Sequence, residues 1–564
     1  MRLRLATIAL TSLVSLPPLT AAATPGPATT VVVGNSNVPE SVALARQYAA
    51  ARDLPPGQVC LLDVEDVEDI DLASYRADFL EPLRACLDAT PGTLERIEAA
   101  VIVRGLPLRV RIPVADATQV VSLAAALMLW ETTRAGSAVL GENPGATVDC
   151  GRPCYGPAWR NPYRRSAFES GWSAEVGEIT WRPLLVTMLH GRTYEDAARL
   201  LDSALAAEAM DPALGEMLFM DGRDSARGVL DVQYDRVIAD LRGLGFTAER
   251  VPFDPDLAGR TLSSFVTGTA TLGATIEGNT FLPGTLVDNL TSFGAGPVNF
   301  RETGESQVSI ARWVALGVAG VHGTVAEPLN RAFPDRTFLV RYVLGATLAE
   351  AYHSSLPNAY WRNLVLGDAI AAPHARRPTV ELTGVADGSR IAGAETIRVT
   401  ATDIVPDRGV ASVTAYLDGV QVAMSTGDTL EHCLVAPAGD EQQLLIVARA
   451  GEDPAGDRIF RPKGWLAITL SSDGVSTDCA EPQPDGGLAD GGVAEGGIAV
   501  ADGGLDAGAD GPSGEGCGCR VFGARPGGMP AAFFMAAVLL ARRRRSAARS
   551  ARGRRSAATT PRAG

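Results

Sequence analysis

Short apolar runs alternate with amphipathic stretches along residues 29–376. The apolar runs, rich in Val, Leu and Ile, occupy residues 30–33, 59–62, 99–103, 184–188 and 217–220. Helical spacing marks residues 39–52, 73–88, 117–130 and 194–210, and one more helix is predicted to end near residue 244. Such alternation predicts βαβ units, in which helices cover a largely parallel sheet.

The pattern changes near residue 377, where the helical signals stop. Alternating or apolar runs at residues 378–382, 397–401, 413–417 and 444–448 are separated by turn signals such as Asp418-Gly419. This predicts a β-sandwich over residues 377–472 that resembles the bacterial immunoglobulin-like modules of cell-surface proteins. Such modules are usually spacers, and a ligand-binding role is the alternative.

The N-terminus has the layout of an export signal. Two arginines, Arg2 and Arg4, precede an apolar stretch over residues 5–16, and residues 21–23 are all alanine. A basic start, a short apolar core and small residues before the cleavage point are typical of a secretory signal peptide. We therefore expect residues 1–23 to be removed and the mature chain to start near Thr24.

The C-terminal part begins with a linker rich in Gly, Asp and Ala over residues 473–516, which cannot bury a core. Cys517 and Cys519 follow, then an apolar segment over residues 527–541 and four arginines at 542–545. The basic tail over residues 546–564 contains no acidic residue, and its arginines should stay on the cytoplasmic side of a membrane.

The order of cysteine pair, apolar run and arginine block over residues 517–545 resembles the myxobacterial sorting signal MYXO-CTERM. The resemblance implies cleavage by a sorting protease and display at the cell surface. A plain tail anchor formed by residues 527–541, at least transiently a transmembrane helix, is the alternative. Lipid attachment to Cys517 or Cys519 stays open.

Composition supports an exported protein. The 564 residues carry a formal net charge of −15, and an acidic body is a poor partner for nucleic acid. Export places the eight cysteines in an oxidising compartment. The expected disulfides are Cys60–Cys86, Cys150–Cys154 and Cys433–Cys479, although spacing does not determine connectivity. A zinc site at Cys150 and Cys154 is the alternative, and no cofactor is predicted.

Polar residues at predicted strand ends are the candidate ligand-binding positions, because α/β proteins place functional groups there. They are Arg104, Arg109, Asp221, Glu277, Asp288, His322, Glu327 and Asp368. Carboxylates gathered at one edge could bind a cation or a sugar, or act as acid and base. The competing interpretation is that they cap helices and satisfy turns. No catalytic residue is identified.

Several motifs in residues 29–376 resemble an uncharacterised family of exported proteins from bacteria that carry exosortase-type sorting systems. The motifs are the segments 103–109, 156–157, 161–163, 304–306, 315–328 and 363–368. The last part also resembles the gingipain-type cysteine peptidases distantly. That resemblance implies a fold class of α/β type, a parallel-sheet sandwich like that of caspases and gingipains, followed by the all-β immunoglobulin-like domain.

Gingipain-type chemistry requires a His after one strand and a Cys after the next. Residues 263–299, the corresponding stretch, contain neither. The sequence therefore favours a non-catalytic surface protein with an interaction or assembly role. The alternatives are a carboxylate-dependent hydrolase acting on an extracellular polymer, and a divergent cysteine peptidase with a displaced thiol such as Cys150 or Cys154. The expected partners are the export machinery, the sorting protease and an envelope or matrix polysaccharide or protein.

Overall fold

The computed structural model describes residues 24–114, 117–130, 174–176, 179–181, 184–210, 215–357, 361–452 and 460–479. The expected signal peptide, the sorting tail and the pair Cys150 and Cys154 lie outside these residues. Within the described part, no helix combines the length and hydrophobicity that crossing a membrane requires.

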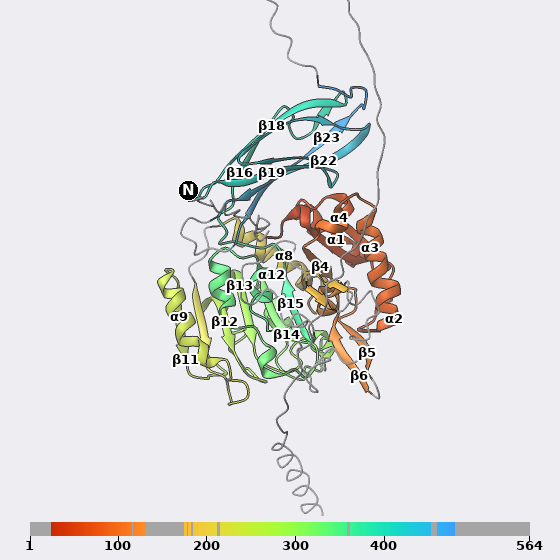
Figure 1. Cartoon of the computed structure of the whole chain (residues 1–564). Coiled ribbons are helices and arrows are strands. Elements are labelled where there is room, and N and C mark those ends of the chain that lie inside the picture. Colours follow the sequence, from red (N-terminus) through yellow and green to blue (C-terminus); the bar gives the residue numbers. More distant parts are fainter. Residues whose placement is uncertain are drawn as a thin grey trace, which may run out of the picture. The chain divides into compact units, whose positions relative to one another are not determined.

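A ten-stranded mixed sheet forms the centre of the first domain (Figure 1). Its order is β11-β10-β12-β13-β14-β15-β9-β4-β1-β2. The strands are β1 (Thr30–Asn35), β2 (Val59–Leu62), β4 (Ala99–Val103), β9 (Leu185–Leu189), β10 (Glu216–Met220), β11 (Thr247–Val251), β12 (Thr261–Thr267), β13 (Thr280–Asn289), β14 (Gly320–Thr324) and β15 (Asn363–Gly367). Their apolar side chains are almost entirely buried, which explains why they read as continuous hydrophobic runs.

The strands of this sheet are parallel except at β15, which runs antiparallel to β14. A single bridge between Leu366 and Met188, parallel in its local geometry, joins β15 to β9. The two strands nevertheless run in opposite directions, because β15 starts beside Ser122 and β9 starts beside Met128, at the two ends of one helix. The carboxyl ends of the flanking strands share one edge, because Arg301, after β13, forms an ion pair at 2.8 Å with Glu68, after β2. The prediction of a largely parallel sheet is thus confirmed, with one reversed strand added.

Four helices that pack on the sheet match predicted ones: α1 (Pro39–Ala51), α3 (Glu81–Asp88), which forms the last part of the predicted segment 73–88, α8 (Tyr194–Glu208) and α9 (Tyr234–Gly243). No positions were predicted for three further helices, α10 (Ile310–Ala315), α11 (Phe338–Val343) and α12 (Leu348–His353). Local capping fixes two of these starts: the Thr193 and Thr347 hydroxyls accept hydrogen bonds from the backbone N–H groups of Asp196 and Glu350.

The prediction of one helix over residues 117–130 is wrong. The segment starts as a strand, β6 (Ala117–Ser122), which pairs antiparallel with β5 (Arg109–Val114), and only then becomes α5 (Leu123–Met128). β5 also pairs with β3 (Asp69–Asp71). The helix starts at Ser122 because its Oγ accepts a hydrogen bond from the Ala125 N–H at 2.9 Å.

The second domain is the predicted β-sandwich. One sheet has the order β16-β18-β21 and the other β17-β23-β22-β19-β20. The strands are β16 (Thr379–Thr383), β17 (Ser389–Ile391), β18 (Ala394–Thr402), β19 (Val410–Leu417), β20 (Val420–Thr426), β21 (Thr429–Val435), β22 (Gly439–Ala450) and β23 (Lys463–Ser472). Alternate residues of β18 are buried, as expected for a sheet with one face on the core.

Two disulfides are present in the described residues. Cys60 in β2 is bonded to Cys86 in α3, which ties that helix to the outer strand of the large sheet. Cys433 in β21 is bonded to Cys479, beyond the end of β23. These are two of the three pairings that the sequence suggested.

Candidate functional site

A cavity of about 390 Å³ opens at the carboxyl ends of β1, β4 and β9. The chain runs from β1 to β2 on one side of β1 and later forms β4 on the other side, so the cavity lies where the strand order reverses. Open α/β sheets bind ligands at this position, and the volume is in the range of small-molecule sites. We call it the strand-end cavity. Its walls include Val38, Glu40, Asp66, Glu68, Arg104, Leu106, Leu108, His190, Tyr194, Pro297, Phe300 and Arg301.

His190 is the most buried polar side chain in the wall of the strand-end cavity. It follows β9 directly, is 5% exposed, and meets the Phe300 ring edge-on at 4.4 Å between centroids. Burial, reinforced by the positive charge of Arg104, lowers the pKa of His190 to about 3. The imidazole is therefore neutral, and its Nδ1 has no hydrogen-bond partner among the described residues.

Arg104 lies beside His190 because β4 and β9 are neighbours. Its guanidinium stands 5.3 Å from the ring centre of Tyr194, and Nη1 donates to the carbonyl of Gly191. The next residue, Gly105, has a φ of +99°, and a Cβ there would come within 2.9 Å of the Tyr194 hydroxyl. Glycine thus lets the chain turn sharply after β4 and carry Arg104 into the cavity wall.

Carboxylates supply the rest of the polar wall. Glu40 belongs to the first turn of α1, and Asp66 and Glu68 follow β2. Glu40, Asp66 and Glu68 are all exposed, and Glu68 is paired with Arg301 through both oxygens. The cavity therefore combines aromatic rings, hydrogen-bond acceptors, a guanidinium and a neutral imidazole.

Of the eight strand-end residues proposed from the sequence, Arg104 alone lines this cavity. Arg109 is bound by both carboxylate oxygens of Asp69. The other surface residues have separate partners: Asp221 pairs with Arg250 at 2.7 Å, Glu277 with Arg312, and Glu327 accepts from Ser292 at 2.7 Å. The acidic residues do not form a common cleft within the described chain, and no group of three metal-ligating side chains occurs there.

Asp288 and His322 lie on neighbouring strands and form a fully buried cluster. His322 Nδ1 is 2.7 Å from Asp288 Oδ1, and Nε2 is 3.0 Å from Asn363 Oδ1. The other Asp288 oxygen forms an ion pair with Arg336. Since Asp288, His322 and Arg336 are all 0% exposed, this cluster lies inside the core and offers no surface to a substrate.

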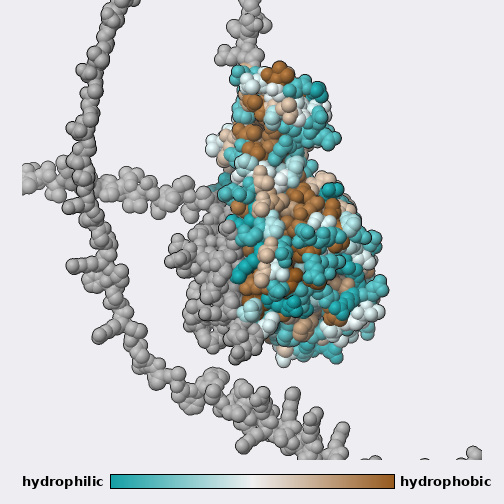
Figure 2. All heavy atoms as spheres, turned by 90° about the vertical axis from the view of Figure 1, so that its right-hand side faces the viewer, coloured by the Kyte–Doolittle hydropathy of each residue, from teal (hydrophilic) through white to brown (hydrophobic). Residues whose placement is uncertain are grey.

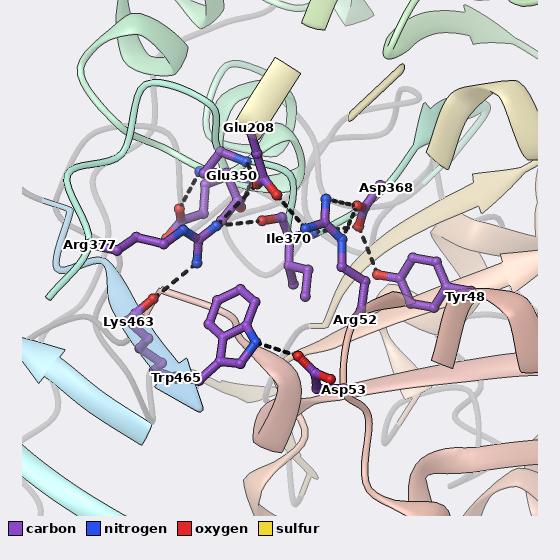
Figure 3. A network of polar contacts seen from close by, with 12 residues as sticks. Tyr48, Arg52, Asp53, Glu208, Glu350, Asp368, Ile370, Arg377, Lys463 and Trp465 are labelled. Atoms are coloured by element: carbon purple, nitrogen blue, oxygen red, sulfur yellow. Dashed lines mark hydrogen bonds and ion pairs between the residues drawn. The ribbon is translucent and has the colours of Figure 1, made fainter. Parts of the chain in front are cut away.

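Asp368 follows β15 at the opposite edge of the sheet, where Figure 3 shows a second network. Its carboxylate accepts from Tyr48 at 2.8 Å and from Arg52 Nε at 2.6 Å. Arg52 also pairs with Glu208, and Arg377 donates to Glu208 at 3.3 Å. Burial raises the pKa of Glu208, but Arg52 and Arg377 lower it more.

The same network reaches the β-sandwich. Arg377 lies over the Trp465 ring at 4.5 Å and donates to the Lys463 carbonyl at 3.0 Å. The indole N–H of Trp465 donates to Asp53 at 3.0 Å (Figure 3). Asp368 is therefore a structural residue, part of the contact between the two domains.

Sequence reasoning missed His190, Tyr194 and Phe300 as site residues. The signal for His190 was available, because it directly follows a predicted strand, as His322 does. Phe300 gave no signal, since its place beside His190 depends on the order of strands in the sheet. On the coloured part of the face drawn in Figure 2, hydrophilic and hydrophobic residues lie side by side.

The comparisons with known proteins identify the second domain. Residues 378–443 match the bacterial Ig domain family, which confirms the predicted class of this part of the chain. No curated protein matches the sequence.

Among solved structures, the fibronectin(III)-like modules of CbhA from Clostridium thermocellum are 16% identical, with a TM-score of 0.13. That match covers 22% of this chain and 58% of theirs. A CARDB domain from Pyrococcus furiosus is 17% identical over 17% of this chain and 96% of its own, also with a TM-score of 0.13. A β-glucosidase from Listeria innocua is 9% identical over 49% of each chain, with a TM-score of 0.15.

Proposed function

We propose that this chain is an exported protein, displayed at the cell surface, that binds a sugar unit of an envelope or matrix polysaccharide in the strand-end cavity without chemically changing it. The observation that carries the proposal is the buried, neutral imidazole of His190, which lines the cavity and whose Nδ1 has no hydrogen-bond partner among the described residues. A buried polar atom left unpaired costs stability, which favours a role that a ligand completes.

The wall chemistry suits a neutral polyhydroxylated ligand. Phe300 and Tyr194 provide ring surfaces for the apolar face of a sugar, and Arg104 and Asp66 offer donors and acceptors for its hydroxyls. Because the pKa of His190 is about 3, the imidazole brings no positive charge at neutral pH. A neutral imidazole can accept a hydrogen bond from a sugar hydroxyl.

The resemblance to gingipain-type peptidases supports binding without catalysis. In that fold class a His and a Cys would follow consecutive strands. Here the corresponding positions are Thr269, two residues after β12, and Asn289, the last residue of β13. The Asn289 side chain is hydrogen-bonded to the Thr269 backbone: the Thr269 N–H donates to Asn289 Oδ1 at 2.9 Å, and Asn289 Nδ2 donates to the Thr269 carbonyl at 3.0 Å. Both residues are buried, so this position lacks both a nucleophile and a base.

The immunoglobulin-like domain and the linker over residues 473–516 would then hold the cavity away from the membrane. This part of the proposal rests on the export and sorting patterns at residues 1–23 and 517–545. Mass spectrometry of the surface-exposed protein from the native cell tests it: the expected masses lack residues 1–23, and an intact chain recovered among soluble cytoplasmic proteins contradicts it.

Binding is tested on the chain of residues 24–564 with an array of envelope and matrix glycans, followed by calorimetry of the best ligand. His190→Leu and Arg104→Ala should each lower affinity at least tenfold, about 1.4 kcal/mol. Glu277→Gln, a carboxylate outside the cavity, is the matched control and should leave affinity unchanged. Equal losses in all three variants, or the release of shortened glycan, would refute the proposal. A thiol-reactive probe separates it from a displaced-cysteine peptidase.

A further inference from the structure

The first described residues, directly after the expected signal peptide, are buried within the fold. Thr24 is 1% exposed, and the segment continues through the helical turn Pro27–Thr29 into β1. The carbonyl of Pro27 accepts from Gln58 at 2.6 Å, and that of Ala28 from Arg96 at 2.8 Å. The segment also meets the β-sandwich, since a Cβ at Gly26 would lie 3.2 Å from Lys463 Cδ. The beginning of the mature chain is thus a structural part of the protein.

Glu350, in the first turn of α12, lies against Thr24. Its Oε2 accepts the Thr347 N–H at 2.8 Å, which closes the capping box of α12. Its Oε1 and the Thr24 hydroxyl lack hydrogen-bond partners among the described residues, although the two side chains are neighbours. Glu350 is 0% exposed. A carboxylate in this position needs a cation to remain charged.

We propose that cleavage of the Ala23–Thr24 bond supplies that cation, so that the new α-ammonium of Thr24 pairs with the Glu350 carboxylate and locks the mature fold. Water hydrolyses the amide bond: Ala23 leaves with the new carboxylate, and the amine of Thr24 takes up a proton. The backbone nitrogen and the hydroxyl of Thr24 are separated by two carbon atoms only, so a side chain that touches Glu350 brings the nitrogen within its reach.

The electrostatic setting favours an ammonium here. Burial raises the pKa of Glu350 to about 7, while the contacts with Thr347 and the nearby Thr24 hydroxyl lower it, and the negative charge of Glu98 raises it. Lys463 is the cation on the sandwich side, and it pairs with Glu98 at 3.3 Å. An α-amino group has an ordinary pKa of about 8. The two groups therefore stabilise each other's charged forms near neutral pH.

The uncleaved chain behaves differently. A carboxyl group whose pKa is raised on folding contributes its full stability below its ordinary pKa of 4.5 and loses it progressively as pH rises to about 7. Without the ammonium, the protein should therefore weaken as pH approaches neutrality and stay weakened at higher pH. Because Thr24 is inaccessible once folded, cleavage has to come before the segment packs, which couples removal of the signal to completion of the structure.

The test uses residues 24–564 released from a fusion partner so that the first residue is Thr24, compared with the same chain carrying two added alanines. Melting temperature is measured from pH 6 to pH 9. The chain starting at Thr24 should melt higher at pH 8 by about 3 °C or more, and the gap should narrow towards pH 6. In a Glu350→Gln background the two chains should melt together.

Glu381→Gln, an exposed carboxylate on β16, is the control and should leave the gap intact. N-terminal sequencing of the natural protein and acylation of its α-amine provide a readout independent of stability. Thr24 should be the first residue, and its amine should react at least tenfold more slowly in the folded protein than after denaturation. A different first residue, a gap that persists with Glu350→Gln, or rapid acylation would each overturn the proposal.

Discussion

The two edges of the ten-stranded sheet carry polar clusters built from similar residues but with different degrees of pairing. At the amino edge of the parallel strands, Tyr48, Arg52 and Glu208 surround Asp368, whose carboxylate receives several donors. At the carboxyl edge, His190 lines a cavity, and its imidazole Nδ1 lacks a hydrogen-bond partner within the described chain. At the amino edge, charged side chains that are paired with one another hold the domains together. At the carboxyl edge, a polar group without a partner among the described residues lies beside a cavity and is available to a ligand.

The largest expected effect comes from breaking the paired network at the amino edge. Asp368→Asn leaves Arg52 buried beside a neutral amide, which should cost about 3–5 kcal/mol because both partners are almost fully buried. Urea denaturation measures the loss. A loss below about 1 kcal/mol would place this network among ordinary surface pairs.

Acid should weaken the two edges at different pH values. Burial lowers the pKa of His190 to about 3, and of His353 and His374 to about 4. A histidine whose pKa is lowered on folding stabilises the protein above its ordinary pKa of about 6.5. This contribution is lost as pH falls towards its pKa in the folded protein. For each of these histidines, the free energy of unfolding should fall by up to about 1.4 kcal/mol for every pH unit as pH drops from 6 to 4.

The pKa of Glu208 is lowered in the folded protein, so the stability that this carboxylate contributes is present above its ordinary pKa. It is lost only as pH falls through the pKa of Glu208 in the folded protein. Denaturation curves at pH 7, 6, 5 and 4.5 separate the two edges. His190→Leu should reduce the slope between pH 6 and pH 4.5, and an unchanged slope would show that His190 is protonated in the folded protein.

A smaller effect on stability is expected from His190→Leu at pH 7. Leucine fills a similar volume and removes an unpaired polar atom, so the free energy of unfolding should change by about 1 kcal/mol or less. Glycan affinity, measured on the same sample, should fall. A loss of stability as large as that of Asp368→Asn would show that His190 mainly stabilises the fold. The two edges would then not differ in the way described above.

The smallest effect belongs to Glu277→Gln. Its ion pair with Arg312 is half exposed, so the expected cost is about 0–1 kcal/mol with no change in ligand affinity. Calorimetric melting and glycan titration together check this. A marked loss of affinity would move the binding site away from the strand-end cavity.

The sequence predicted the elements better than the site. Continuous hydrophobic runs located β1, β2 and β4 because buried parallel strands bear apolar residues on both faces. The segment at residues 117–130 failed because its β-branched first half and alanine-rich second half were treated as one helix. Nothing local reveals that β15 is reversed, since direction depends on the connection from α12.

The candidate residues divide for a related reason. Asp288 and His322 both end apolar runs, and only their pairing in adjacent strands shows that they bind each other inside the core. His190 ends a similar run but has no such neighbour among the described residues. A strand-end histidine can therefore be nominated from sequence, whereas its availability depends on which side chains the sheet order brings beside it.

The bond between Cys433 and Cys479 has a mechanical consequence. Tension applied to the chain beyond residue 479 passes through the sulfur bridge into β21 and its neighbour β18. Residues 434–478, which include β22 and β23, carry none of the load and cannot be peeled away strand by strand. A pull on the chain beyond residue 479 would therefore spare β22 and β23 and load the strands from β16 to β21 instead.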